Sequence, residues 1–291
     1  MSITAGLEHI IRENEPLGTH TRLNLGGVAE FFAEPTSEAE LVEIVKRSAA
    51  QDIPVRLIGR GSNILVRDEG VAGIVVSLAA PDFCKIQVNG QQLKSTGGTQ
   101  LSHLVSTAVR EGFSGPENLV GIPGTVGGAL HVNTGAHGYD IGSRLQNARV
   151  MTRGGEILER KKDELSFSYR QSSLDELVIL DATFQFEKED PEVLTKRMQK
   201  LWIVRRSTQP ITQTSMYVFK DRGVESASDL IEQSGLRGTR VGEVEISDKD
   251  ANLFIASEGA TCSDVLKLID LVQDQVSDKL GVEIEPAVEI W

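Results

Sequence analysis

The chain has 291 residues, of which 40% are hydrophobic and 25% are charged, and its formal net charge is -12. These proportions are ordinary for a globular protein, and the length suits two domains of roughly 150 residues each. The acidic balance argues against a general nucleic-acid-binding protein, which presents a basic surface, but a small anionic ligand needs only a few local donors.

The first residues and the cysteines indicate where the protein works. Residues 1–14 lack the apolar core of a signal peptide, and no stretch of the sequence is apolar over the length of a membrane span. The two cysteines, Cys84 and Cys262, are too few for a disulfide framework or a structural zinc site. We therefore expect a cytoplasmic protein with no membrane partner and no metal site.

The first part of the chain alternates short β segments with helical segments. We expect strands over 29–33, 55–58 and 74–78, and helices that start after Ser37 and over about 100–111. Ser37 and Glu40 fit a capping box, in which each side chain satisfies the main-chain donor of the other.

The strand expected at 55–58 runs into Gly59-Arg60-Gly61-Ser62-Asn63, where a dinucleotide-binding turn of the Rossmann type has to be considered. That pattern fails because its third glycine position is Ile64 and no helical periodicity follows. Taken alone, this segment predicts a tight turn, since short glycine motifs are weak evidence for a ligand.

A second glycine-rich stretch, residues 121–138, holds six of the 28 glycines among apolar residues and almost no charges. Glycine admits backbone angles that are closed to other residues and lets a bound group approach the main chain. Successive main-chain N–H groups in such a loop form a concavity that suits phosphate oxygens. The stretch therefore predicts a buried cradle for a phosphorylated cofactor, and two separated glycine loops suit a cofactor that contains a diphosphate.

The second half of the chain is predicted to be β first and then rich in helix. Residues 147–186 are expected to be mainly β, and the charged residues 187–191 mark a break. Helices are expected over about 191–206, 227–233 and 263–280, the last two ended by Gly235 and Gly281. A closing strand is expected over 282–290, at a sheet edge because Pro286 has no main-chain donor.

Taken in order, these segments resemble the UDP-N-acetylenolpyruvoylglucosamine reductases, the MurB flavoenzymes of peptidoglycan precursor synthesis. The resemblance is collinear from about residue 17 to residue 291, and the two glycine-rich segments together are its most specific part. Its landmarks are, in chain order, 23–27, 59–65, 121–138, 168–172, Gln209-Pro210, Phe219-Lys220, 230–236 and Glu285-Pro286.

The resemblance implies an α+β fold with two domains. Residues 1–188 would form an FAD-binding domain of the vanillyl-alcohol-oxidase (PCMH) type with an N-terminal subdomain, and residues 189–291 a smaller C-terminal α+β substrate domain of the MurB type. The implied FAD contacts are Gly59, Arg60, Gly61, Ser62, Asn63, Ile64, Gly121, Ile122, Pro123, Gly124, Thr125, Gly127, Gly128, Asn133, Gly135 and Gly138.

Some members of that superfamily tether the flavin through a histidine in the first loop. This chain has Arg60 near that place, so the resemblance implies that FAD is held non-covalently. His131 and His137 lie in the second glycine-rich stretch, and we expect them to be ordinary packing or hydrogen-bonding residues.

The resemblance also implies a reaction in two halves. NADPH reduces the flavin, and the reduced flavin passes hydride to the enolpyruvyl double bond of a UDP-sugar while a proton arrives at the adjacent carbon. Arg170 matches the family arginine that stabilises charge developing near the substrate carboxylate in a water-poor site. Tyr169, Ser172 and Lys220 are the implied substrate contacts. The plain alternatives are a surface arginine at 170 and a solvated lysine at 220.

The proton-transfer positions depart from the family. In the family motif Gly-Ser-x-Phe-Lys-Asn-Pro the serine, or a cysteine in some members, donates the proton, whereas this chain has Tyr217 there. Ala287 replaces a family glutamate that supports the transfer, and Asp250 replaces a family histidine. Loss of a positioned acid costs about 10²–10⁴-fold in rate. We expect Tyr217 to be a substitute acid, and Ala287 to have no catalytic function but to leave room for the phenol.

Two functions of different classes follow from this pattern. The first is an FAD- and NADPH-dependent reductase that converts UDP-N-acetylglucosamine enolpyruvate to UDP-N-acetylmuramate, as a monomer or weak homo-oligomer. The second is a diverged relative that binds a flavin or a nucleotide sugar with lost or altered catalysis, which the changes at 217 and 287 motivate. A flavin oxidase with another substrate is a third alternative. The cofactor is the firmer expectation, because the flavin segments keep the family pattern.

Overall fold

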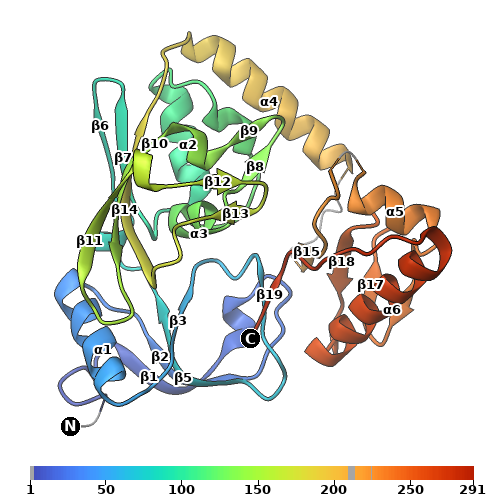
Figure 1. Cartoon of the computed structure of the whole chain (residues 1–291), viewed down its shortest axis with the longest axis horizontal. Coiled ribbons are helices and arrows are strands. Elements are labelled where there is room, and N and C mark those ends of the chain that lie inside the picture. The colour runs from blue at the N-terminus through green and yellow to red at the C-terminus, as the bar shows by residue number, and fades with distance from the viewer. Residues whose placement is uncertain (1–2, 209–213, 224) are drawn as a thin grey trace. The chain divides into compact units, whose positions relative to one another are not determined.

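The computed structural model describes residues 3–208, 214–223 and 225–291. The chain divides into two compact units: unit 1 is Met1–Asn14, Phe31–Arg60 and Ala72–Ile203, and unit 2 is Glu15–Glu30, Gly61–Val71 and Val204–Trp291 (Figure 1). Each unit is therefore built from separated stretches of sequence, and two early segments fold with the C-terminal part. The expected boundary between an FAD-binding domain and a C-terminal domain, at residues 188 and 189, stays a prediction.

The first sheet lies mostly in unit 1 and has the strand order β1-β2-β5-β3. Its strands are β1 (Ile11–Pro16), β2 (Val28–Ala33), β5 (Val71–Ser77) and β3 (Val55–Ile58), and β3 runs parallel to β5. Helix α1 (Glu38–Ala50) packs on this sheet through Leu41, Ile44 and Val45, which are fully buried. The three strands and the helix expected from the sequence are confirmed.

The start of α1 corrects one detail of the predicted capping box. Ser37 is the N-cap, and its hydroxyl accepts the main-chain N–H of Glu40 at 3.3 Å, as expected. The Glu40 carboxylate instead accepts the main-chain N–H and the hydroxyl of Thr36, at 2.7 and 2.8 Å. Glu40 therefore caps the residue before the N-cap, so the reciprocal half of the box is wrong.

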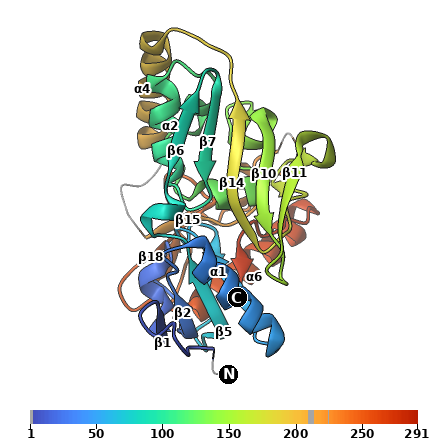
Figure 2. The same ribbon diagram turned by 90° about the vertical axis from the view of Figure 1, so that its left-hand side faces the viewer.

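The second sheet of unit 1 is antiparallel and has the order β11-β10-β14-β7-β6 (Figure 2). Its strands are β6 (Ile86–Asn89), β7 (Gln92–Thr96), β10 (Leu145–Met151), β11 (Ile157–Lys161) and β14 (Val178–Gln185). Helices α2 (Leu101–Arg110) and α3 (Val126–His131) share a hydrophobic core with this sheet. The predicted helix near 100–111 and the β character of 147–186 are confirmed. The hairpin β6–β7 was not predicted.

Unit 1 also contains short connecting elements. Two small hairpins are formed by β8 (Gly135–Ala136) with β9 (Tyr139–Asp140) and by β12 (Phe167–Ser168) with β13 (Gln171–Ser172). Short 3-10 helices lie at Pro81–Phe83, Pro116–Leu119, Ile141–Arg144 and Lys162–Glu164. Helix α4 (Pro191–Thr208) follows and confirms the helix expected over 191–206.

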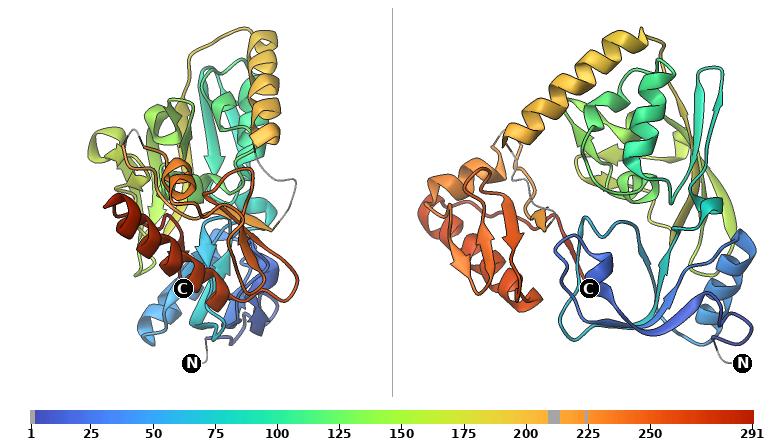
Figure 3. Two further views of the ribbon diagram at one scale, coloured as in Figure 1. Left: turned by 90° about the vertical axis from the view of Figure 1, so that its right-hand side faces the viewer. Right: turned by 180° about the vertical axis from the view of Figure 1, so that it is seen from behind.

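Unit 2 is built on an antiparallel sheet of order β15-β18-β17-β16. Its strands are β15 (Ser215–Tyr217), β16 (Arg240–Val241), β17 (Val244–Ile246) and β18 (Leu253–Ala256), and a 3-10 helix lies at Leu17–His20. Helices α5 (Ala227–Gln233) and α6 (Cys262–Leu280) cover it (Figure 3). The expected helices are confirmed, and Gly281 ends α6 with a left-handed φ of 66°.

The C-terminal segment pairs less than expected. Only Glu289–Ile290 forms a strand, β19, which runs parallel to β4 (Ile64–Leu65); upstream, Pro286 makes a single bridge with Phe219. The continuous strand predicted over 282–290 is therefore wrong. Proline lacks the N–H that a ladder needs, which explains why the pairing is interrupted around it.

The early segment 61–71, which belongs to unit 2, is bonded through Asp68 to the start of α6. The Asp68 carboxylate accepts the first N–H groups of α6, from Cys262 and Ser263, at 2.9 and 3.0 Å. Asp68 therefore satisfies donors that a helix start leaves open.

Over the described parts of the chain, no helix combines the length and apolarity that a membrane crossing needs. The landmark Gln209-Pro210 lies outside the described residues.

Candidate functional site

The predicted site residues are distributed over both units. Unit 1 contains Gly59, Arg60, the whole of the 121–138 stretch, Tyr169, Arg170 and Ser172. Unit 2 contains Gly61, Ser62, Asn63, Ile64, Tyr217, Lys220 and Ala287. Each group is therefore described within its own unit, and the predicted roles of these residues stay proposals.

The two glycine-rich segments meet within unit 1 at Gly59 and Thr125. A Cβ placed on Gly59 would lie 2.8 Å from Thr125 Oγ1 and 3.3 Å from its Cγ2. Thr125 is the N-cap of α3, where its hydroxyl accepts the N–H of Gly128 at 3.2 Å. Residue 59 is thus a glycine because its main chain lies directly against the cap of the second segment. Sequence order alone does not reveal this contact.

The main-chain donors of the second segment fall into two groups. The first N–H groups of α3 are bonded within the protein, Val126 to Thr99 O and Gly127 to Gly97 O, both at 2.8 Å. Among the described residues, the N–H groups of Gly124 and Thr125 have no hydrogen-bond partner. The donors that fit a phosphate therefore lie in the turn before α3, beside Gly59, and not on the helix end. Two adjacent main-chain donors of this kind suit phosphate oxygens, and the binding of the FAD diphosphate at this turn stays a prediction.

In the rest of the glycine-rich stretch, local structure explains the residue types at Asn133 and Gly138. Asn133 is 4% exposed; its Nδ2 donates to Ser168 O at 2.9 Å, and its Oδ1 accepts the Gly142 N–H at 3.1 Å. Gly138, with φ of 76°, forms the two-residue turn between β8 and β9 together with His137, whose φ is 53°. Both residues of such a turn need positive φ, so Gly138 is explained without a ligand. The Asn133 side chain is bonded within the protein, and its main-chain N–H donates to Leu130 O at 3.1 Å, so its predicted role as a cofactor contact stays a prediction.

Arg170 lies at the tip of the β12–β13 hairpin, in the two-residue loop Tyr169-Arg170. Its φ is 56°, a left-handed conformation that costs a non-glycine residue roughly 1 kcal/mol and that is found preferentially at functional sites. Asn133 is hydrogen-bonded to this hairpin at Ser168 O. The Arg170 guanidinium lies 5.9 Å from the centre of the Tyr169 ring, and Tyr169 is 56% exposed. Arg170 therefore lies in a turn that is hydrogen-bonded to the glycine-rich stretch, and its predicted role at the substrate carboxylate stays a prediction.

In unit 2 the first glycine segment pairs with the C-terminus. Gly61 is buried, and a Cβ there would overlap the carbonyl of His20. Asn63 Nδ2 donates to Ala287 O at 3.0 Å, and Asn63 O accepts the Glu289 N–H at 2.9 Å. The segment predicted to hold FAD is therefore directly bonded to the position where the family has its glutamate.

Tyr217 lies at the end of β15, opposite Leu253 of β18. Its hydroxyl donates to Asp250 Oδ2 at 2.8 Å. The two residues that depart from the family at 217 and 250 are thus hydrogen-bonded to each other, a pairing that sequence reasoning missed. The sequence offered one signal for this pairing, namely that positions 217 and 250 both differ from the residues of the family. Ala287 donates its N–H to Val218 O at 2.7 Å, so the main-chain pairing sets it against Val218, and its expected role of leaving room for Tyr217 stays a prediction.

Lys220 has a partner within unit 2. Its Nζ lies 3.2 Å from Glu285 Oε2, and its N–H donates to Glu285 O at 2.9 Å. The two side chains are 33% and 78% exposed. An ion pair this exposed contributes little to stability, so the lysine can exchange its carboxylate for an anionic ligand.

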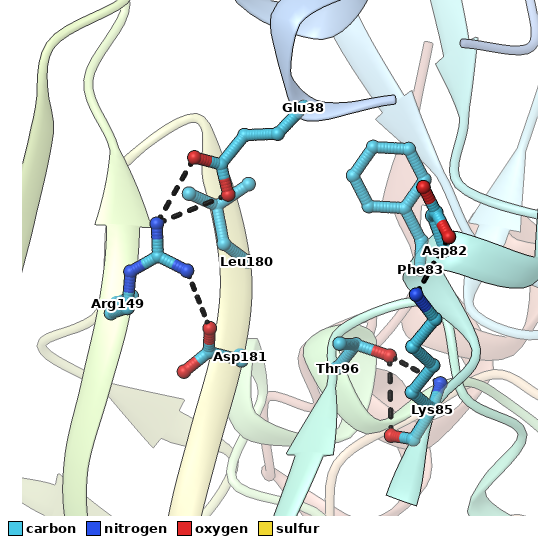
Figure 4. Close-up of a pocket in the computed structure, with 8 residues that line it drawn as sticks. All are labelled: Glu38, Asp82, Phe83, Lys85, Thr96, Arg149, Leu180 and Asp181. Atoms are coloured by element: carbon cyan, nitrogen blue, oxygen red, sulfur yellow. Dashed lines mark hydrogen bonds and ion pairs between the residues drawn. The ribbon is translucent and has the colours of Figure 1, made fainter. Parts of the chain in front are cut away.

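A pocket of about 190 Å³ lies elsewhere in unit 1 (Figure 4). Arg149 of β10 bridges Asp181 of β14 and Glu38 of α1 at 2.8 and 3.0 Å, and Lys85 pairs with Asp82 at 2.6 Å. None of the predicted site residues lines it. Its cations and carboxylates satisfy one another and join α1 to the second sheet, which indicates a structural network.

Comparison with known proteins finds two family matches along the chain. Residues 29–160 match the family described as FAD binding domain, and residues 209–291 match UDP-N-acetylenolpyruvoylglucosamine reductase, C-terminal domain. The chain is 38% identical over 286 residues to the UDP-N-acetylenolpyruvoylglucosamine reductase of Rhodopirellula baltica, covering 98% of this chain and 94% of that protein. It is 35% identical over 281 residues to the Bacillus subtilis reductase of the same name, covering 95% and 92%.

A solved structure gives the same picture for the fold. The crystal structure of UDP-N-acetylenolpyruvylglucosamine reductase from Thermus caldophilus matches with a TM-score of 0.81 and 32% sequence identity. The match covers 97% of this chain and 98% of that one. The α+β architecture with an FAD-binding part and a smaller C-terminal part is thereby confirmed.

Proposed function

The chain belongs to the UDP-N-acetylenolpyruvoylglucosamine reductase family, and from this premise we propose that it reduces UDP-N-acetylglucosamine enolpyruvate to UDP-N-acetylmuramate, with FAD as cofactor and NADPH as hydride donor. The observation that carries the proposal is similarity over nearly the whole chain, in both the FAD-binding part and the C-terminal part. A diverged binding protein is not favoured, because the named relatives match through the substrate part as well as the cofactor part.

The cofactor is assigned to the turn that brings the two glycine segments together. Gly59 and the N–H groups of Gly124 and Thr125, which have no partner among the described residues, would hold the diphosphate. Bound FAD would carry hydride from NADPH to the enolpyruvyl double bond. Arg60, in the first loop, is no attachment point, so the cofactor is held without a covalent bond.

Three side chains of this protein would act on the substrate. The Arg170 guanidinium stabilises negative charge that develops at the substrate carboxylate, a contribution worth about 10²–10³-fold where donors are preorganised. The Tyr217 hydroxyl takes the place of the family donor and supplies the proton to the carbon next to the one that receives hydride. Lys220 binds an anionic group of the substrate. Tyr169 and Ser172 flank Arg170 and complete the substrate contacts; the Ser172 hydroxyl already accepts the Leu174 N–H at 3.1 Å.

The cellular setting follows from the same activity. We infer that the protein works in the cytoplasm, where NADPH and the UDP-sugar are made, and that it supports cell-wall biogenesis and cell shape. We also infer a monomer or weak homo-oligomer, which sedimentation of the flavin-loaded protein tests directly.

Anaerobic stopped-flow mixing separates the two halves of the proposed reaction. NADPH is expected to bleach the flavin, and addition of the enolpyruvyl UDP-sugar is expected to restore its absorbance. Arg170→Gln should slow only the second phase, by about 10²-fold, whereas Arg153→Gln, at an exposed arginine of the same unit, should slow neither. Reduced flavin that the substrate leaves reduced would refute the reductase function and favour the binding protein; consumption of dioxygen instead would favour an oxidase.

A further inference from the structure

The Tyr217 side chain is tied at both ends to one turn, residues 250–253. At the main-chain end, β15 pairs Tyr217 with Leu253, and the next N–H, of Val218, donates to Asn252 O at 3.1 Å. At the far end, the phenol hydroxyl donates to Asp250 Oδ2 at 2.8 Å. The ring therefore has little freedom to swing, and its hydroxyl has a defined position before any ligand arrives.

The Asp250 carboxylate is itself held from several directions. Its Oδ1 accepts the Asn252 N–H at 3.1 Å, and its main-chain carbonyl accepts the Leu253 N–H at 3.0 Å. The turn is anchored to α5, because the Ala251 N–H donates to Ser228 Oγ at 3.0 Å. Movement of the Asp250 carboxylate toward or away from the Tyr217 hydroxyl would therefore break its hydrogen bond with the Asn252 N–H.

Several described cations lie on segments that adjoin Tyr217 or Asp250. Arg22 Nε donates to Ser215 O of β15 at 3.2 Å, two residues before Tyr217. Lys220, on the chain beyond β15, pairs with Glu285 at 3.2 Å, and Arg237 pairs with Glu232 at 2.5 Å. Lys249 precedes Asp250 and is exposed. The Tyr217 hydroxyl therefore faces a carboxylate, with no described cation bonded to that carboxylate to offset its charge.

We propose that Asp250 is a positioning residue that fixes the Tyr217 hydroxyl and, by taking its hydrogen, limits Tyr217 as the acid of the second half-reaction. The inference rests on the proposed function. A carboxylate that accepts the phenol hydrogen directs it away from the substrate, and a negative neighbour disfavours the phenolate that proton donation leaves behind. Where the family has a serine and a histidine, this chain has Tyr217 as the acid and Asp250 as the residue that restrains it.

The proton balance shows where the restraint acts. Hydride adds to one carbon of the double bond, the π electron pair moves to the other carbon, and that carbon forms a C–H bond as the Tyr217 O–H bond breaks. The phenolate then regains a proton from solvent. With Asp250 ionised, this step places two negative charges side by side; with asparagine there, a neutral amide can donate to the phenolate.

The test compares Asp250→Asn, Tyr217→Phe and the double variant, each flavin-loaded, with Asp248→Asn as the matched control on an exposed carboxylate two residues away. Asp250→Asn is expected to speed substrate-dependent flavin reoxidation by about 10-fold or more, since one nearby charge changes acidity by an order of magnitude or more. Reduction by NADPH is measured separately in each variant, and it should be unchanged in the control Asp248→Asn. In the double variant the gain should vanish, leaving the rate of Tyr217→Phe. A slower Asp250→Asn protein, or an equal gain without the phenol, would overturn the inference.

A second readout does not depend on turnover. Ultraviolet titration, with the Tyr217→Phe trace subtracted, isolates the ionisation of Tyr217 from that of Tyr139 and Tyr169. Asp250→Asn should move that ionisation to lower pH by about one unit or more, and Asp248→Asn should leave it in place. If wild-type flavin is never reoxidised by the UDP-sugar, the proposed function fails, and this titration still decides the inference: a shift supports it and an unmoved curve refutes it. Flavin content and melting temperature verify that each variant is folded.

Discussion

Asn252 provides a quantitative test of what holds the segment beside Tyr217. Its side chain is 5% exposed; its Oδ1 accepts the Phe219 N–H at 2.8 Å, and its Nδ2 donates to the Phe219 carbonyl at 2.9 Å. Phe219 is 3% exposed, so Asn252→Ala leaves two buried main-chain groups without partners. Each such group costs about 1–3 kcal/mol. The free energy of unfolding of unit 2 should therefore fall by about 2–6 kcal/mol.

Urea unfolding followed by Trp291 fluorescence in a Trp202→Phe background measures this effect. Trp291 reports on unit 2, because its main-chain N–H donates to Leu65 O at 2.9 Å. The midpoint should fall with little change in slope. Asn89→Ala, at an exposed position of β6, is the matched control and should change stability by no more than about 0.5 kcal/mol. A loss below about 1 kcal/mol in Asn252→Ala would refute the reasoning, since one orphaned group alone costs that much.

Two further predictions concern unit 1. Gly59→Ala should lower the flavin content of the purified protein, because the new Cβ would lie 2.8 Å from the hydroxyl of Thr125, whereas Gly154→Ala, whose nearest contact would be at 3.7 Å, should retain it; visible absorbance per protein measures both. Hydrogen bonds from the main chain and hydroxyl of Thr36 lower the pKa of Glu40 from 4.5 to about 2, so this carboxylate stabilises the fold above pH 4.5 and loses that contribution as the pH falls toward 2. Melting temperatures of Glu40→Gln should therefore decline less over this range than those of wild type, and parallel curves would contradict the assignment.

Local signals predicted five of the six α-helices in the described chain and several strands of unit 1, but not the strands β15 to β18 of unit 2. The helix α6 follows from apolar residues at helical spacing and from Gly281 at its end, both of which act within a few residues. Strand β1 was missed because its sequence, Ile-Arg-Glu-Asn-Glu-Pro, is charged and has no apolar alternation. It is a strand because β2 supplies the pairing, and β propensity depends on such neighbours. The error at the end of the chain is the opposite one. A strand was predicted over 282–290 from its apolar residues, but around Pro286 the chain makes only a single bridge.

The site divides in the same way between sequence and structure. By itself the sequence determined the family, because family membership depends on residue type and order. It also predicted the FAD segments and the positions where the family's proton donor and its partners are replaced. Only the tertiary structure decided that Gly59 lies against Thr125 and that Tyr217 donates to Asp250, residues 33 apart in the chain. The physical reason is strand register: pairing β15 with β18 brings the start of one turn to the phenol, and no local propensity encodes that contact.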